Sequence, residues 1–194
     1  LEEMNVALVV PVKSFAAAKG RLSGVLDSDA RAALARQCAE QVVAAGAPWP
    51  VYVVCDDDAT QSWAASVGAR AVRQKSPGLN AAVACGVAAA RRDGAAHVVV
   101  SHADLPLATT YAHLVQVGEI VLVPDRHHDG TNVLSLPADA AFDYRYGPGS
   151  LAAHIASATA IGLPHRVVDD GLLGLDLDTS DDLEELDRRR TTTP

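Results

Sequence analysis

The sequence predicts an α/β domain with a mainly parallel central sheet and helices on both faces. Short apolar runs typical of buried strands, such as Val98, Val99 and Val100, alternate along the chain with longer segments of helical pattern. This alternation is typical of parallel sheets whose crossovers are helices. Polar loops rich in acids, cations and glycines follow several of the predicted strands. Open α/β sheets bind ligands at the edge formed by the carboxyl ends of their strands, so we expect a ligand site among these loops.

Each strand is predicted from a short apolar run, and the seven strands are expected at residues 6–12, 51–55, 69–72, 97–104, 119–123, 133–136 and 165–168. The spacing is shorter from residue 119 to 176, which predicts an antiparallel strand or hairpin in that region. Pro106 cannot continue a central strand, so the fourth strand should end near Asp104.

The helices are predicted from capping residues and are expected at residues 27–45, 59–67, 80–92, 109–116, 151–161 and 180–190. Acidic residues 27–29 suit the start of the first helix, and Gly46 suits its end. Acidic residues 56–58 are read in the same way, with metal binding as the alternative. Asn80 is a candidate cap for the alanine-rich helix.

Composition limits the possible classes of protein. The 194 residues are 49% apolar and 21% charged, which predicts one globular domain over residues 1–194. The net charge of -8 argues against a nucleic-acid binder. Three cysteines in apolar segments favour a reduced, cytoplasmic protein, and no apolar stretch is long enough to span a membrane. Residues 1–3, before Met4, are read as an expression remnant and residues 191–194 as a frayed tail.

Asp104 lies where the predicted strand at 97–104 turns polar after three consecutive valines. A carboxylate at the end of a parallel strand is well placed to hold a metal ion beside a phosphate. Asp176 and Asp178 are two residues apart and would share one face of a strand. Either could hold magnesium together with Asp104. The alternative is that Asp104 caps a short helix that begins near Ala108.

Cations and glycines follow other predicted strands. Lys13, Lys19 and Arg21 come after the first strand and could neutralise a triphosphate, or they could form a solvated basic loop. Two helix starts are rich in glycine, and free N–H groups at a helix N-terminus bind anions. Their notable residues are Gly78, Asn80, Gly147, Gly149 and Ser150. The second of these segments could also be an ordinary Gly-Pro turn.

Paired acids, cations and glycine-rich helix starts together favour phosphoryl or nucleotidyl transfer, in which catalysis depends on positioning and on neutralising charge. The chain has no Walker lysine motif, and no Gly-x-Gly-x-x-Gly follows the first strand, which disfavours kinase-type ATP binding and dinucleotide binding.

Eight short motifs resemble, in order, those of the guanylyltransferases that build the deazaflavin coenzyme F-420. They are VPVK at 10–13, AKGRL at 18–22, GLNAA at 78–82, ADLPL at 103–107, PDR at 124–126, DGTN at 129–132, YGPGS at 146–150 and DLDT at 176–179. Each motif is weak alone, whereas the ordered set over nearly the whole chain is specific.

The resemblance implies a GT-A-like (Rossmann-like) nucleotidyltransferase fold, GTP as donor, Mg²⁺ as cofactor and a small phosphorylated three-carbon acid as acceptor. Bacterial members use phosphoenolpyruvate, archaeal members use 2-phospho-L-lactate, and some bacterial members use 3-phospho-D-glycerate. We expect phosphoenolpyruvate, because the Ala- and Arg-rich, Lys-poor composition hints at a GC-rich bacterium. No nucleic acid or membrane partner is implied, and the assembly is left open between a monomer and a homodimer.

The resemblance also implies roles for individual residues. Asp104 and Asp176 would hold the metal, with Asp178 as the alternative second ligand. The acceptor would bind main-chain groups of Thr131, Gly147 and Ser150. Lys13, Lys19 and Arg21 would stabilise the leaving pyrophosphate, and the nucleotide would contact Pro11, Lys13, Gly78, Leu79, Asn80 and Asp104. His102 stands where the family commonly has another residue, and its role is open.

Two other functions remain as alternatives. Another GT-A-type nucleotidyltransferase is disfavoured, because the usual Leu-x-Gly-Gly opening is missing after the first strand. A non-catalytic nucleotide-sensing domain would keep the glycine-rich loops without needing paired metal-binding acids.

Overall fold

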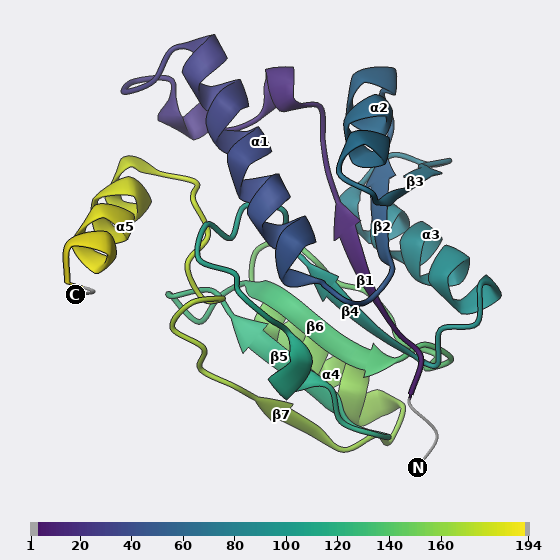
Figure 1. Ribbon diagram of the computed structural model, residues 1–194. Helices are drawn as coiled ribbons and strands as arrows, with labels where there is room; N and C mark the ends of the chain where they lie inside the picture. Colours follow the sequence, from purple (N-terminus) through teal and green to yellow (C-terminus); the bar gives the residue numbers. More distant parts are fainter. Residues whose placement is uncertain (1–3, 193–194) are drawn as a thin grey trace.

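The computed structural model describes residues 4–192 and arranges them as a seven-stranded sheet between two layers of helices (Figure 1). Residues 1–3, read above as a remnant, and residues 193–194 of the predicted tail lie outside the described part. All seven predicted strands are present, as β1 (Val6–Pro11), β2 (Val51–Cys55), β3 (Arg70–Arg73), β4 (His97–Ser101), β5 (Ile120–Pro124), β6 (Thr131–Pro137) and β7 (His165–Val167).

The strands lie in the order β3-β2-β1-β4-β6-β5-β7. Only β6 among them runs antiparallel to its neighbours, β4 and β5. The mainly parallel sheet and the late hairpin are therefore confirmed. The carboxyl ends of β1 and β4 lie side by side, because these strands pair in parallel through Val6–His97 and Val9–Val100.

Five α-helices are described: α1 (Ser28–Ala45), α2 (Asp58–Ser66), α3 (Leu79–Arg92), α4 (Ser150–Ala160) and α5 (Ser180–Thr192). Their acidic starts act as predicted, since Asp27 accepts a hydrogen bond from the Ala30 N–H and Asp57 from the Thr60 N–H, both at 2.8 Å. Short 3₁₀ turns are η1 (Phe15–Ala17), η2 (Gly20–Leu22) and η3 (Ala112–Leu114).

Two local predictions are wrong. The helix expected at residues 109–116 is only the turn η3, so Asp104 caps no helix near Ala108. Asn80 is not the cap of α3, which begins one residue earlier with Gly78 at the N-cap. Helix α5 ends at Thr192, within the predicted tail of residues 191–194.

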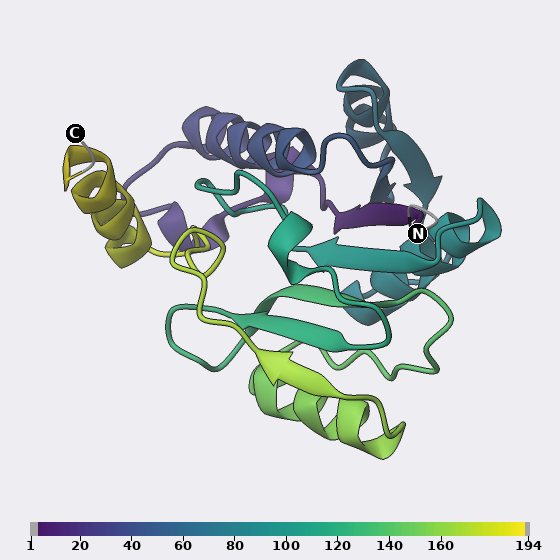
Figure 2. The same ribbon diagram turned by 60° about the horizontal axis from the view of Figure 1, so that its bottom comes forward.

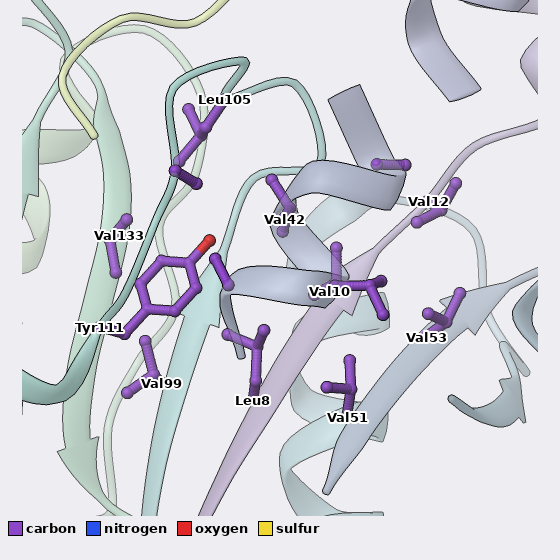
Figure 3. Packing of buried hydrophobic residues seen from close by; sticks show 14 of the residues in the cluster. Leu8, Val10, Val12, Val42, Val51, Val53, Val99, Leu105, Tyr111 and Val133 are labelled. Atoms are coloured by element: carbon purple, nitrogen blue, oxygen red, sulfur yellow. The ribbon is translucent and has the colours of Figure 1, made fainter. Parts of the chain in front are cut away.

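Helices cover both faces of the sheet, as predicted. Helices α1 and α2 lie on one face, and α3 and α4 lie on the other (Figure 2). Alternation along β1 explains this, since Leu8 and Val10 pack toward α1 whereas Ala7 and Val9 pack toward α3. Figure 3 shows the first of these layers, where strand side chains meet Val42 of α1 and Tyr111. Such burial is the main favourable contribution to folding.

Helix α3 packs unusually closely on the sheet at Gly86. A Cβ atom there would lie 2.5 Å from Val9 Cγ1 and 2.6 Å from Val54 Cγ2. This close approach holds the middle of α3 against β1 and β2. Helix α5 packs at the side of α1 through the small cluster of Cys38, Leu175, Leu177 and Leu186. No helix in residues 4–192 combines the length and apolar character needed to cross a membrane.

Candidate active site

A cavity of about 630 Å³ opens at the carboxyl edge of the sheet. Its wall comes from the loop after β1, the start of α3, the loop after β4 and the segment before α5. The sequence predicted a ligand site at this edge. Among the predicted site residues, those in the wall are Pro11, Lys13, Lys19, Gly78, Leu79, Asp104, Asp176 and Asp178, and His102 joins them.

Three carboxylates meet at one end of this cavity. One oxygen from each of Asp104, Asp176 and Asp178 lies within 4.8 Å of the others. Asp104 follows β4 in a loop, and the other two acids lie in a loop before α5 rather than on a strand. The predicted shared strand face is therefore wrong, although the side chains converge. The Leu177 N–H donates to the Asp104 carbonyl at 3.1 Å, which joins the two loops.

Lys19 inserts its ammonium group into this acidic cluster. Its Nζ lies 2.6 Å from Asp104 Oδ2 and 3.4 Å from Asp178 Oδ1, and its side chain is only 5% exposed. Burial alone would lower the pKa of Lys19, but the carboxylate charges of Asp104 and Asp178 outweigh it, so this pKa is raised. Lys19 has a left-handed backbone with φ of 57°, a conformation that costs most residues energy.

The carboxylates differ in their proton affinity. Burial opposes ionisation of Asp104, but the neighbouring Lys19 lowers its pKa below the usual value. Burial and then the negative charge of Asp104 raise the pKa of Asp176. One ammonium group therefore leaves negative charge uncompensated in the cluster.

A divalent cation fits these donors. Carboxylate oxygens are ligands that Mg²⁺ prefers, and the three acids are close enough to share one ion. Asp104 Oδ1 is buried without a hydrogen-bond partner among the described residues. A buried unpartnered carboxylate oxygen beside two further carboxyl groups is the arrangement that a bound cation would stabilise.

Two buried side chains that sequence reasoning missed hold the acidic loop in place. Asn132 Nδ2 donates to the Leu173 carbonyl at 3.0 Å and to Asp176 Oδ1 at 3.3 Å. Asp182 accepts hydrogen bonds from the main-chain N–H groups of Asp178 and Thr179 at 3.0 and 2.8 Å. The carboxylate of Asp182 also pairs with Arg126 at 2.8 Å. The sequence signal for these two residues lay in two of the motifs. DGTN contains Asn132, and PDR contains Arg126, the partner of Asp182.

The predicted acceptor-binding residues lie beyond the cavity wall. Thr131 and Ser150 are buried, and the Thr131 hydroxyl lies 3.0 Å from His154 Nδ1. The start of α4 is held by Asp129, whose carboxylate accepts from the Gly149 N–H at 3.0 Å. Gly147 is exposed and has a φ of 137°, which favours glycine.

Asn80 connects the nucleotide side of the cavity to this second loop. Its Oδ1 accepts a hydrogen bond of 2.7 Å from the Tyr146 N–H. The Tyr146 ring in turn packs against His102, with ring centroids 5.5 Å apart. Arg21 remains mostly in solvent, with a 76% exposed side chain 3.7 Å from Asp178.

A mainly parallel sheet with converging acids, a buried lysine and a glycine-started helix at its carboxyl edge defines a nucleotidyltransferase-like α/β protein. The fold agrees, since a protein from Desulfovibrio desulfuricans G20 described as a nucleotide-diphospho-sugar transferase superposes with a TM-score of 0.80 at 18% identity, over 98% of this chain and 89% of that one. The predicted GT-A-like fold is confirmed.

The chain belongs to the CofC-like guanylyl transferases, because that family's model matches residues 6–188. A phosphoenolpyruvate guanylyltransferase of Rubrobacter xylanophilus is 39% identical, over 95% of this chain and 94% of the relative. One of Sphaerobacter thermophilus is 37% identical, over 94% and 93%. A 3-phospho-D-glycerate guanylyltransferase of Phenylobacterium zucineum is 33% identical, over 93% and 88%. The predicted family is confirmed.

Proposed function

We propose that this chain transfers the guanylyl group of GTP to phosphoenolpyruvate and releases pyrophosphate. The convergence of Asp104, Asp176, Asp178 and Lys19 at one end of the cavity carries the proposal. Two relatives at 37–39% identity named for phosphoenolpyruvate favour this acceptor over 3-phospho-D-glycerate.

In this reaction an oxygen of the acceptor phosphate forms a bond to the α-phosphorus of GTP, and the bond from that phosphorus to the β-phosphate oxygen breaks. The acceptor phosphate is already an anion, so no strong general base is needed. Two anions must approach each other, and the main task of the protein is therefore to neutralise charge. Bound Mg²⁺ would supply Lewis-acid stabilisation of the phosphate oxygens.

The residues of this chain would divide the work by position. Asp104 would hold the cation, and Asp176 and Asp178 are the candidates for its second ligand. The Lys19 side chain would move so that its ammonium group leaves the acids and pairs with the leaving pyrophosphate. Lys13 and Arg21 would assist it. Gly78, the N-cap of α3, has no side chain, and main-chain N–H groups at this helix start suit a nucleotide contact.

Pyrophosphate release with GTP and Mg²⁺ tests the proposal. We expect release with phosphoenolpyruvate and much less with 2-phospho-L-lactate or 3-phospho-D-glycerate. Release with one of the other two acids would reassign the acceptor. Silence with all three, from protein that binds GTP, would overturn guanylyl transfer to these acids.

A further inference from the structure

Three neighbouring residues at the acidic cluster, Asp104, His102 and Tyr146, each carry a polar atom without a partner in residues 4–192. Buried side-chain atoms without a hydrogen-bond partner in the described chain include Asp104 Oδ1, His102 Nε2 and the Tyr146 hydroxyl. The three residues are neighbours, because His102 Nδ1 lies 4.0 Å from Asp104 Oδ1 and the ring centroids of His102 and Tyr146 are 5.5 Å apart. Buried polar groups are nearly always satisfied, so such a group of orphans indicates a polar ligand.

We propose that His102 and Tyr146 bind the carboxylate of the acceptor acid, with His102 Nε2–H and the Tyr146 O–H as donors. This inference rests on the proposed guanylyl transfer. The acceptor carries two anionic groups, and its phosphate must reach the α-phosphorus near Asp104. With the phosphate in that place, the carboxylate of the acceptor lies farther from the three aspartates. The contacts from Asp104 to His102 and on to Tyr146 lead in that direction.

Surrounding contacts hold both donors in place. The His102 N–H donates to the Asn132 carbonyl at 3.0 Å, so the residue is fixed beside β6. Tyr146 is held through its main-chain N–H by Asn80, and its ring meets His154 edge-on with centroids 4.6 Å apart. His102 also lines the cavity, so its side chain borders both the nucleotide side and the Tyr146 side.

The experiment compares steady-state constants for His102→Leu, His102→Gln and Tyr146→Phe. A lost hydrogen bond to a charged group should raise the KM for the acceptor roughly 10- to 100-fold in His102→Leu and Tyr146→Phe. The kcat and the KM for GTP should stay within about threefold, since the reacting phosphate keeps its contacts. Glutamine offers a donor near the position of Nε2, so His102→Gln should recover most of the loss. Tyr144→Phe is the matched control and should behave as wild type.

Unchanged acceptor KM in both loss variants would overturn the proposal, as would a rise confined to the KM for GTP, which would assign the pair to the nucleotide. A fall in kcat with unchanged acceptor KM would contradict it too. If wild-type protein releases no pyrophosphate with any three-carbon acid, the proposed function itself fails. The two failures are thus distinguishable.

Discussion

Replacing Lys19 by glutamine is expected to strengthen binding of a divalent cation in the absence of nucleotide. The Lys19 ammonium group occupies the acidic cluster at 2.6 Å from Asp104 and 3.4 Å from Asp178. A metal ion entering the cluster must therefore displace it. Nucleotide phosphates would give the displaced ammonium group a new partner, so nucleotide and metal should bind cooperatively in the wild-type protein.

The size of the effect follows from the burial of the pair. Lys19 and Asp104 side chains are 5% and 22% exposed, so their bond is far from a solvated surface pair. A charge-assisted hydrogen bond of this kind contributes about 1.5–3 kcal/mol. The contact to Asp178, which is 44% exposed, adds at most a few tenths of a kcal/mol. Relief of about 2 kcal/mol corresponds to a roughly 30-fold lower dissociation constant.

Titration with Mn²⁺, followed by electron paramagnetic resonance, measures this constant without turnover. Arg21→Gln is the matched control. It also removes one positive charge near Asp178, but its side chain is 76% exposed and 3.7 Å away. We expect less than a threefold change there. Equal or weaker Mn²⁺ binding by Lys19→Gln would refute the competition between the ammonium group and the metal.

Three further predictions concern catalysis, pH and packing. Asp104→Asn should lower turnover roughly a thousandfold without loss of folding, whereas Asp181→Asn, on the exposed start of α5, should stay active. Burial lowers the pKa of His97 to about 4, so the neutral form stabilises the folded state above pH 6.5, and stability falls as pH drops toward 4. The free energy of unfolding of His97→Gln should thus fall by about 2 kcal/mol less than that of wild type between pH 7.5 and 5. Gly86→Ala should cost about 1–3 kcal/mol through overpacking.

Near-normal pyrophosphate release by Asp104→Asn would show that Asp104 does not hold the metal. Denaturant titrations at the two pH values would count against the His97 account if wild type and His97→Gln changed equally. A Gly86→Ala protein as stable as wild type would show that Val9 and Val54 can move away from the new methyl group.

The sequence was sufficient to predict the sheet and its edge, because these depend on local patterns. The run of Val98 to Val100 followed by Asp104 predicted a buried strand that delivers an acid to the ligand edge, and β4 does so. Asp176 and Asp178 converge with Asp104, although the strand predicted for them is a loop. Any backbone that brings this segment to the end of β4 places the acids together.

Contacts between distant segments could not be predicted in this way. Asn80 looked like a helix cap because Asn often is one, but its side chain holds Tyr146, 66 positions along the chain. Asp182 looked like an ordinary acid in the first turn of a helix, and it organises the main chain of Asp178 and Thr179. Tertiary partners decide such roles, and spacing along one segment carries no information about them.

We expect the α-phosphorus of GTP, and not its γ-phosphorus, to be transferred to the acceptor. Incubation with phosphoenolpyruvate, Mg²⁺ and GTP labelled at either phosphorus tests it directly. Guanylyl transfer should move the α-label into a new organic product and release the γ-label as pyrophosphate. Transfer of γ-label to the organic acid, with α-label left in a guanosine diphosphate, would contradict it.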